Sequence, residues 1–299
     1  MPLEDCKFKH CCSRFLLNIS RRRTLNLFQL RQERVRLFMK YSTVDEWQGR
    51  YFGEAYLEIY ARLMYERKKV LREVDFIRNA LHLKKGSRIL DLACGFGKHL
   101  IFFLKKGLCA FGLDIMHPYL RYAMGKMPVT FRRKPPLVIG TMTRLPFQEE
   151  TFEAVVSLFN SFGYRPMDAP DPDMAILREV ARVLRTGGQF LVEVPNKQPV
   201  IKMVRTTPQT IQCGRDFLIH EFWDYDTRWK ILFNRTFFNI RGGITEAGYC
   251  LRLFTLRELT ALFQNAGLGV QRIFGDYDGA EYDRAISPMM LVIGEKPGR

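Results

Sequence analysis

Residues 87–104 constrain the fold most, because a short apolar strand, a glycine-rich turn and a helix follow one another there without a gap. The strand is expected over 87–92, the turn over 93–97, and the helix through Leu100 and Leu104. A strand that leads directly into a helix returns to the sheet by a right-handed crossover, so that its neighbour lies parallel to it. This unit therefore predicts an α/β protein in which helices cover a parallel sheet.

The remaining chain supplies the other elements of such a sheet. Short apolar segments alternate with helical patterns, which favours a seven-stranded, mostly parallel sheet with helices on both faces. One helix is expected to open at Pro170 and to stop at Gly187 and Gly188, and a capping box of Thr255 with Glu258 opens a later one. The six further strands are predicted over residues 109–115, 138–139, 152–159, 189–194, 269–274 and 289–294, the last two as a hairpin.

Three segments do not follow this alternation. Residues 1–40 form a basic N-terminal extension, with ten Lys and Arg against three acidic residues. Residues 41–86 carry aromatic and aliphatic side chains at helical spacing, which predicts a lid of two amphipathic helices. Residues 197–254 become rich in aromatic and β-branched residues and predict an inserted antiparallel cap. The main domain is accordingly expected to span residues 87–299.

The composition excludes several architectures. No apolar run among the 299 residues approaches the roughly 18 needed to cross a bilayer, so no membrane span is predicted. The seven cysteines are scattered, which indicates a reducing, cytoplasmic compartment. Nearly half of the net charge of +16 lies in the extension, which we interpret as a solvated tail, with contact to RNA as the alternative. No metal site is predicted, because the Cys and His group within residues 6–12 lacks a second spaced pair.

Polar residues stand where the predicted strands end. Asp91, Asp114, Thr141, Asn160 and Asn196 occupy these positions after the first five strands. The carboxyl ends of parallel strands share one edge of the sheet, so these side chains are expected to surround one ligand site. A carboxylate beside the glycine turn repels a pyrophosphate and attracts an ammonium group. The turn also lacks a third glycine at the spacing of a dinucleotide fingerprint.

Four motifs occur in a recognisable order: DLACGFG over residues 91–97, Asp114 placed 23 residues after Asp91, LPF with FEAV over 145–155, and LRTGG over 184–188. In order and spacing they resemble the class I S-adenosylmethionine-dependent methyltransferases, over roughly residues 87–297. Within that family the likeness is to small-molecule enzymes with an aromatic N-terminal lid and an inserted β cap. The resemblance implies a Rossmann-like fold and S-adenosylmethionine as the cofactor.

The same resemblance implies that Asp91 supports the amino group of the cofactor and that Asp114 receives both ribose hydroxyls. The chain departs from the usual motif at Ala93, which replaces the first glycine and suits a turn that needs a small side chain but not a positive φ. Thr141 stands where an acid usually receives the adenine amino group, which leaves the Thr hydroxyl or the backbone around Met142 for that role. The predicted cofactor residues are Asp91, Ala93, Cys94, Gly95, Gly97, Asp114, Ile115, Thr141, Met142 and Phe159.

Methyl transfer from a sulfonium is an in-line displacement, so the protein mainly aligns the acceptor and excludes water. The resemblance places the loop after the fourth strand beside the methyl group, which makes Asn160 and Tyr164 the predicted catalytic residues. Aromatic side chains of the lid and the cap are expected to line the acceptor site, with one arginine to hold an acidic group. These predicted substrate residues are Tyr56, Tyr60, Trp223 and Arg252.

We therefore predict a methyltransferase that acts on a small-molecule acceptor. Two alternatives stay open: an RNA or protein methyltransferase that uses the basic extension, and a non-catalytic Rossmann-like binding module, prompted by Ala93 and Thr141. The first predicts binding that weakens steeply with salt. The second predicts no thermal shift with S-adenosylmethionine. The sequence makes no prediction of oligomeric state.

Overall fold

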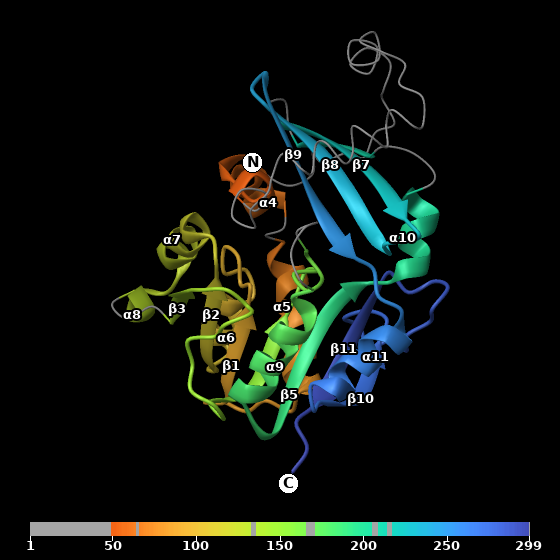
Figure 1. Ribbon diagram of the computed structural model, residues 1–299. Coiled ribbons are helices and arrows are strands. Elements are labelled where there is room, and N and C mark those ends of the chain that lie inside the picture. Colours follow the sequence, from red (N-terminus) through yellow and green to blue (C-terminus); the bar gives the residue numbers. More distant parts are fainter. Residues whose placement is uncertain are drawn as a thin grey trace.

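The computed structural model describes residues 49–63, 66–132, 136–165, 171–204, 209–213 and 217–298 (Figure 1). These residues form a seven-stranded sheet with flanking helices and, above one end of it, a separate four-stranded sheet. The predicted basic extension lies outside the described residues, as does the beginning of the predicted lid. No described helix is both long enough and apolar enough to cross a membrane.

The large sheet consists of β1 (Arg88–Leu92), β2 (Cys109–Asp114), β3 (Leu137–Ile139), β4 (Phe152–Ser157), β5 (Leu184–Pro195), β10 (Gly269–Phe274) and β11 (Met289–Glu295). Its strand order is β10-β11-β5-β4-β1-β2-β3. The strands β1 to β5 run parallel, and β11 lies antiparallel to both β5 and β10. The predicted seven-stranded, mostly parallel sheet is confirmed. Its order reverses between β1 and β4, the place at which α/β sheets bind their ligands.

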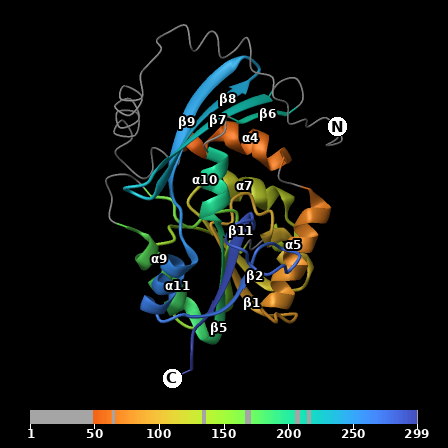
Figure 2. The same ribbon diagram turned by 90° about the vertical axis from the view of Figure 1, so that its right-hand side faces the viewer.

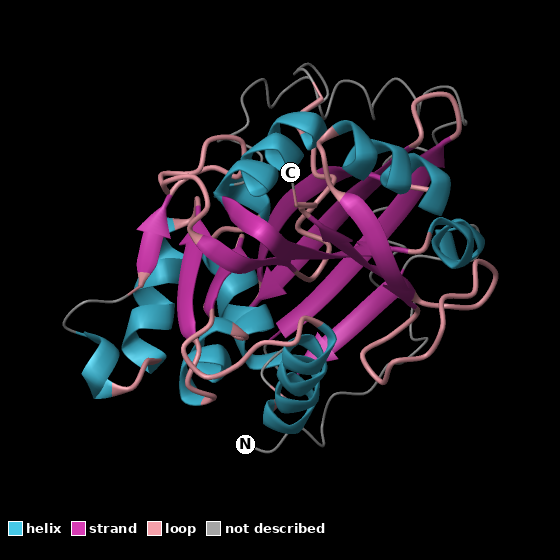
Figure 3. Ribbon diagram, turned by 90° about the horizontal axis from the view of Figure 1, so that it is seen from below, coloured by secondary structure: helices cyan, strands magenta, loops and turns pink. Residues whose placement is uncertain are grey.

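The described helices are α4 (Glu54–Leu63), α5 (Arg67–Ala80), α6 (Leu100–Lys105), α7 (His117–Lys126), α8 (Val129–Arg132), α9 (Asp173–Val183), α10 (Lys197–Val204) and α11 (Leu256–Asn265). Helices lie on both sides of the large sheet (Figure 3). Successive strand residues point to opposite faces, so Ile89 and Leu90 of β1 belong to two separate buried clusters. The first cluster contains Val74 of α5 and Phe103 of α6, and the second contains residues of α9 and α11.

The fifth strand starts earlier than the sequence predicts. The prediction ended a helix at Gly187 and Gly188 and opened the strand directly after them, whereas α9 and β5 meet at residues 183–184. Gly187 has a φ of +74°, and the glycine pair lies where the register between β4 and β5 shifts. Hydrogen bonds from Gly187 N to Lys296 O (2.8 Å) and from Lys296 N to Gly188 O (2.9 Å) hold this irregular segment in the sheet. The glycines therefore shape a strand rather than stop a helix.

The strands β6 (Gln209–Cys213), β7 (Phe217–Asp226), β8 (Ile231–Ile240) and β9 (Gly243–Arg252) form the antiparallel sheet that we call the cap. The helix α4 lies beneath the cap, on the side of the large sheet (Figure 2). Its residues Ile59 and Tyr60 share a buried cluster with Ile219 of β7 and Phe238 of β8. The inner face of the cap, defined as the face that contacts α4, is thus covered by the chain that precedes the large sheet.

The cap is joined to the loop after β4. Tyr164 forms an isolated bridge with β9. Backbone hydrogen bonds also link Arg165 N to Cys250 O at 3.1 Å and Arg252 N to Gly163 O at 2.9 Å. This short segment continues the edge of β9. The loop from which the sequence predicts acceptor contacts is consequently fixed to the cap.

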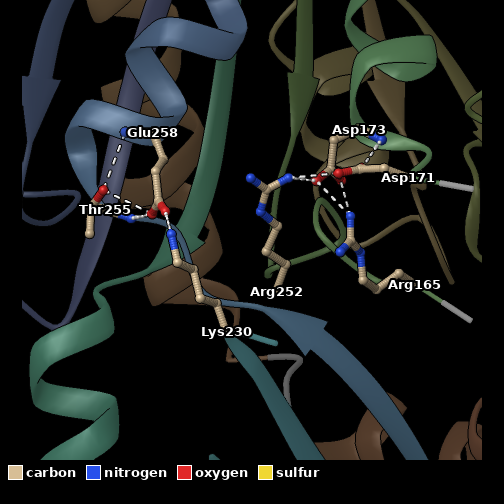
Figure 4. Close-up of polar contacts among 7 residues, drawn as sticks. All are labelled: Arg165, Asp171, Asp173, Lys230, Arg252, Thr255 and Glu258. Carbon is tan, nitrogen blue, oxygen red and sulfur yellow. Dashed lines mark hydrogen bonds and ion pairs between the residues drawn. The ribbon is translucent and has the colours of Figure 1, made fainter. Parts of the chain in front are cut away.

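A capping box opens α11, as the sequence predicts (Figure 4). The Thr255 hydroxyl accepts the backbone N–H of Glu258 at 3.2 Å, and Glu258 Oε2 accepts that of Thr255 at 2.9 Å. Lys230 Nζ lies 2.6 Å from Glu258 Oε1. Burial alone would raise the pKa of Glu258, but hydrogen bonds from Lys230 and Thr255 hold that pKa at about 2. The ion pair between Lys230 and Glu258 therefore joins the start of α11 to the turn between β7 and β8.

Replacing Thr255 by Ala is expected to lower the free energy of unfolding by about 1 kcal/mol, because the Glu258 N–H loses its acceptor. The matched variant Thr255→Ser keeps the hydroxyl and should unfold at the wild-type midpoint. Urea unfolding followed by circular dichroism measures both variants. A Thr255→Ala protein that unfolds at the wild-type midpoint would show that the box contributes nothing.

Candidate active site

The turn between β1 and α6 contains three residues with positive φ: Ala93 (+60°), Gly95 (+54°) and Gly97 (+74°). The expectation that alanine suits this turn only without a positive φ is therefore wrong. The backbone N–H of Cys94 donates to an oxygen of β2 at 2.9 Å, and this contact holds the turn in place. A left-handed alanine costs roughly 1–2 kcal/mol. At Gly97 a Cβ atom would lie 2.8 Å from that of Ala123 in α7, so the close packing requires glycine.

Asp114 at the end of β2 ties this turn to the neighbouring strand. Its Oδ2 accepts the backbone N–H of Gly95 at 2.7 Å, and its Oδ1 accepts that of Met116 at 2.8 Å. Burial raises the pKa of the Asp114 carboxyl, while the N–H groups of Met116, Gly95 and Ile115 oppose the rise. Each carboxylate oxygen can accept a further hydrogen bond. Asp114 therefore fits the predicted role of receiving hydroxyl groups beside the turn.

Asp91 at the end of β1 is 2% exposed. Its Oδ2 has no hydrogen-bond partner among the described residues. Burial raises the pKa of Asp91 to about 7, with the charge of Asp114 adding to the rise and that of Lys98 opposing it. A buried carboxylate oxygen without a donor is costly unless a ligand supplies one. The carboxylate thus fits the ammonium group of the predicted cofactor.

A buried charged cluster beside Asp91 was missed by the sequence analysis. Lys98 Nζ lies 3.6 Å from Glu73 Oε2 and 3.1 Å from the centre of the Phe159 ring. Burial lowers the pKa of Lys98 to about 8. His99 Nε2 lies 2.8 Å from Glu73 Oε2, and burial lowers the pKa of His99 to about 4, so the neutral ring donates this bond. Glu73 thereby joins α5 to the start of α6.

The loop after β4 holds Phe159 and Asn160 in the left-handed region, with φ values of +54° and +57°. Glu193 Oε2 of β5 accepts the backbone N–H of Phe159 at 2.9 Å and the hydroxyl of Tyr277 at 2.6 Å. Asn160 Oδ1 is buried and has no hydrogen-bond partner among the residues described. The side chain predicted to be catalytic thus presents an unused acceptor next to Phe159. The catalytic role of Asn160 and the cofactor contact of Phe159 stay predictions.

The predicted adenine contacts follow β3. Thr141 is exposed, and its hydroxyl lies 3.1 Å from that of Thr143. Met142 is half-buried against the core cluster of α9 and α11. Gly140 N donates to the backbone oxygen of Asp114 at 3.1 Å, which places this segment at the same edge as the glycine turn. The contact with adenine stays a prediction.

The predicted aromatic residues gather on the inner face of the cap. Tyr56 and Tyr60 of α4 stack with 4.2 Å between their ring centres. Tyr164 packs edge-on against Tyr249 of β9 at 5.2 Å, within a cluster that also contains Trp223. Burial raises the pKa of Tyr56, and the nearby Tyr164 adds to the rise, which places the two groups within electrostatic reach. The structure therefore brings these predicted residues together.

Arg252 lies in an ion-pair cluster at the start of α9 (Figure 4). Its Nη1 lies 2.9 Å from both Asp171 Oδ2 and Asp173 Oδ2, and Arg165 also pairs with Asp171. Burial and the charge of Asp171 raise the pKa of Asp173 to about 6, against the opposing charge of Arg252. The guanidinium thus joins the cap to the core. Its contact with an acidic substrate stays a prediction.

Two further polar residues on the inner face of the cap were missed, Glu221 of β7 and Asn234 of β8, and both are buried. The alternation of β7 could have revealed Glu221, since it occupies an inward position between Ile219 and Trp223. Asn234 carries no comparable signal, because its surroundings are set by the neighbouring strands. Within the described ranges, no group of three or more His, Cys, Asp or Glu residues is arranged to hold a metal ion.

Comparison with known proteins agrees with this geometry. Residues 89–188 match the family model of a methyltransferase domain. A demethylmenaquinone methyltransferase from Mycobacterium bovis is 36% identical over 115 residues, which is 38% of this chain and 44% of that protein. The demethylmenaquinone methyltransferase of Corynebacterium kroppenstedtii is 34% identical over 115 residues, with the same coverage of 38% and 44%. The chain thus spans less than half the length of these curated relatives.

Solved methyltransferase structures share the fold of most of the chain. An S-adenosylmethionine-dependent methyltransferase from Clostridium acetobutylicum has a TM-score of 0.67 at 16% identity, over 81% of this chain and 97% of that one. The CcbJ methyltransferase of Streptomyces caelestis has a TM-score of 0.63 at 20% identity, over 77% and 90%. The sugar N-methyltransferase KedS8 of a Streptoalloteichus species has a TM-score of 0.59 at 18% identity, over 80% and 93%.

The fold is that of solved S-adenosylmethionine-dependent methyltransferases, which agrees with the predicted resemblance. Residues 89–188 match the methyltransferase domain model. This segment contains the glycine turn, Asp91 and Asp114, the residues from which S-adenosylmethionine was predicted as the cofactor.

Ala93→Gly is expected to raise the free energy of unfolding by about 0.5–1 kcal/mol. Glycine takes a positive φ without strain, which stabilises the folded state. The greater conformational freedom of glycine in the unfolded chain offsets only part of this gain. Ala175→Gly, at an exposed position of α9, is the matched control and should lower that free energy by about 0.5–1 kcal/mol. Denaturant unfolding measures both. An Ala93→Gly protein no more stable than the wild type would contradict the strain.

Affinity for S-adenosylhomocysteine, which carries the same ammonium group, is expected to fall as the pH drops below about 7. Only the ionised form of Asp91 attracts that group. Below its pKa of about 7 the carboxyl is protonated, so the carboxyl must lose its proton before the ligand can bind. The affinity then decreases by up to about tenfold per pH unit. Titration calorimetry on both sides of pH 7 checks this, with Asp91→Asn expected to bind more weakly and without the dependence. A wild-type affinity that does not change with pH would contradict the assignment.

Proposed function

We propose that this protein is an S-adenosylmethionine-dependent methyltransferase whose acceptor is a small molecule held between the cap and the carboxyl edge of the large sheet. One observation carries the proposal: two buried carboxylates end neighbouring strands, Asp91 with an unpartnered oxygen and Asp114 bound to the glycine turn. A pyrophosphate would be repelled by Asp91. A ligand that carries both an ammonium group and ribose hydroxyls matches the pair.

Each residue of the site has a defined task in this reaction. When bound, S-adenosylmethionine supplies an electrophilic methyl group on a positively charged sulfur. Asp91 would hold the ammonium group and Asp114 the ribose hydroxyls. Asn160 Oδ1 is buried and unpartnered in the described structure. It would accept a hydrogen bond from the substrate and so orient the lone pair of the atom that is methylated. The aromatic groups of α4 and the cap exclude water, which favours a displacement at carbon.

The burial of the aromatic side chains between the cap and the large sheet supports a small molecule as the methyl acceptor. Tyr51 and Tyr60 are 4% and 8% exposed, and α4 lies between the cap and the large sheet. A polymer would have to present its reactive group to an open surface. The names of the compared proteins, a demethylmenaquinone methyltransferase and a sugar N-methyltransferase, also describe small-molecule enzymes. The alternative of an RNA or protein substrate rests on residues 1–40, which lie outside the described part of the chain.

S-adenosylmethionine and S-adenosylhomocysteine, but not NAD, are expected to raise the midpoint of thermal unfolding. At a ligand concentration one hundred times Kd, the native state gains about 2.7 kcal/mol. Asp114→Ala should remove most of this gain, because the ribose hydroxyls lose their acceptor. Asp75→Ala, on the exposed side of α5, is the matched control and should keep it. Differential scanning fluorimetry of the three proteins measures the shifts.

Three outcomes would contradict the proposal. A wild-type midpoint that neither ligand moves would favour the non-catalytic binding module. Salt-sensitive binding of an RNA oligonucleotide that disappears when residues 1–40 are deleted would favour the RNA alternative. Equal shifts in the wild type and in Asp114→Ala would show that the ligand binds elsewhere.

A further inference from the structure

The inner face of the cap carries one carboxylate in the middle of β7. Alternate residues of the strand point to that face, where Ile219, Glu221 and Trp223 follow one another. In the register with β8, Glu221 lies opposite Thr236 and Trp223 lies opposite Asn234. Glu221 is 6% exposed. A group that ionises in water is therefore enclosed here by aromatic and apolar side chains.

Tyrosine side chains surround this carboxylate. The Tyr60 hydroxyl donates to Glu221 Oε1 at 3.5 Å. Burial raises the pKa of four further tyrosines, and the charge of Glu221 adds to the rise in each of them. These are Tyr51, Tyr56, Tyr164 and Tyr249. All of them stay neutral near pH 7, and the face of a neutral tyrosine ring attracts cations.

Glu221 forms no ion pair with a described Lys, Arg or His side chain, whereas the buried Glu73 pairs with Lys98. Burial therefore raises the pKa of Glu221 to about 7, and hydroxyl groups that donate to it only partly oppose the rise. Ionising a buried carboxylate without a cation is costly. A positively charged ligand would supply the missing partner.

Tyr56 connects Glu221 to the cofactor side of the site. Burial raises the pKa of Tyr56, and the charges of both Glu221 and Asp114 contribute. The ring of Tyr56 lies 6.2 Å from that of Tyr119 in α7. The buried Tyr119 hydroxyl has no hydrogen-bond partner in the described part of the chain. Tyr56 is thus close to both Glu221 and the acid that is expected to hold the ribose.

We propose that the methyl acceptor is an amine, whose ammonium group pairs with Glu221 among the tyrosine rings and transfers a proton to it. This inference rests on the proposed function. Asn234 supports it, because its side chain is 0% exposed and its Nδ2 has no partner among the described residues. Thr236 Oγ1 donates to Asn234 Oδ1 at 2.6 Å, which orients the amide. Nδ2 can therefore donate to an oxygen atom that the amine carries nearby.

The proton transfer is balanced within the pair. The ammonium nitrogen loses one proton and keeps the two electrons of that N–H bond as its lone pair. The Glu221 carboxylate gains the proton and becomes a neutral carboxylic acid, which is the form that burial favours. The amine then has the lone pair that a nucleophile needs. An alcohol, by contrast, brings no charge to pair with Glu221 and is too weak an acid to protonate it.

Matched amines and alcohols test the proposal. The full chain is saturated with S-adenosylhomocysteine and titrated with 2-phenylethylamine, 2-phenylethanol, glucosamine and glucose, and tyrosine and tryptophan fluorescence reports binding. In at least one pair the amine should bind about tenfold more tightly than its alcohol. Glu221→Gln should abolish this preference and leave the affinity for S-adenosylhomocysteine unchanged. The matched control is Glu246→Gln, which removes an acid of β9 that pairs with Arg235 of β8. This variant should keep the preference.

Amines that bind no more tightly than their alcohols, or a preference that survives Glu221→Gln, would overturn the proposal. A wild-type protein that does not bind S-adenosylhomocysteine would overturn the proposed function instead, and the amine assignment with it.

If Glu221→Gln does not fold, the wild type decides by its pH dependence. The groups facing Glu221 from α4, β9 and the loop after β4 are tyrosines that stay neutral near pH 7. Amine affinity should therefore rise as the pH rises through about 7, where Glu221 ionises, while alcohol affinity stays constant. An amine affinity that stays constant would overturn the proposal.

Discussion

The site depends on one hydrogen bond between a side chain and the backbone, which Gly95 donates to Asp114 at 2.7 Å. This bond joins the turn after β1 to the end of β2. Asp91 precedes the same turn, and the arrangement leaves its Oδ2 without a donor among the described residues. Two carboxylates that repel each other are thus held at neighbouring strand ends, where burial and Asp114 together raise the pKa of Asp91. A bound cation would offset both the repulsion between the two carboxylates and the cost of burying the Asp91 charge. Affinity for positive charge therefore follows from the fold itself.

The buried cluster beside this pair is also short of positive charge. In the described structure, the ammonium group of Lys98 acts on three buried carboxylates, those of Glu73, Asp91 and Glu193. A further ammonium group would therefore meet an excess of negative charge. The same cluster links α5, α6 and β5 and, through Tyr277, the loop after β10. Cofactor binding and the packing of these distant elements consequently depend on the same charges.

How much the sequence predicts depends on the range of the interactions. Strand periodicity and turn chemistry are local, so the seven strands apart from the start of β5, the inserted antiparallel sheet and the capping box of α11 were predicted correctly. Asp91 and Asp114 were found because they end predicted strands. Glu193 was missed because it lies in an apolar stretch of β5 and acquires its partners only when distant segments pack against it. Glu221 occupies an inward position in the alternation of β7, but its tyrosine partner comes from the distant α4. The positive φ of Ala93 did not follow from the sequence for a related reason, because contacts with the neighbouring strand hold its turn.

The cap is firmly attached to the rest of the described structure. Backbone hydrogen bonds join β9 to residues 163–165, and Arg252 pairs with Asp171 and Asp173 at the start of α9. The cap is therefore anchored on both sides of the segment that leads from β4 to α9. These contacts hold Tyr249 of β9 beside Tyr164 of the loop after β4. A site whose walls are already ordered loses little free energy in arranging them on binding. Selectivity then rests on the groups that the walls present, and on the inner face of the cap Glu221 is a carboxylate that lacks an ion-pair partner among the described residues.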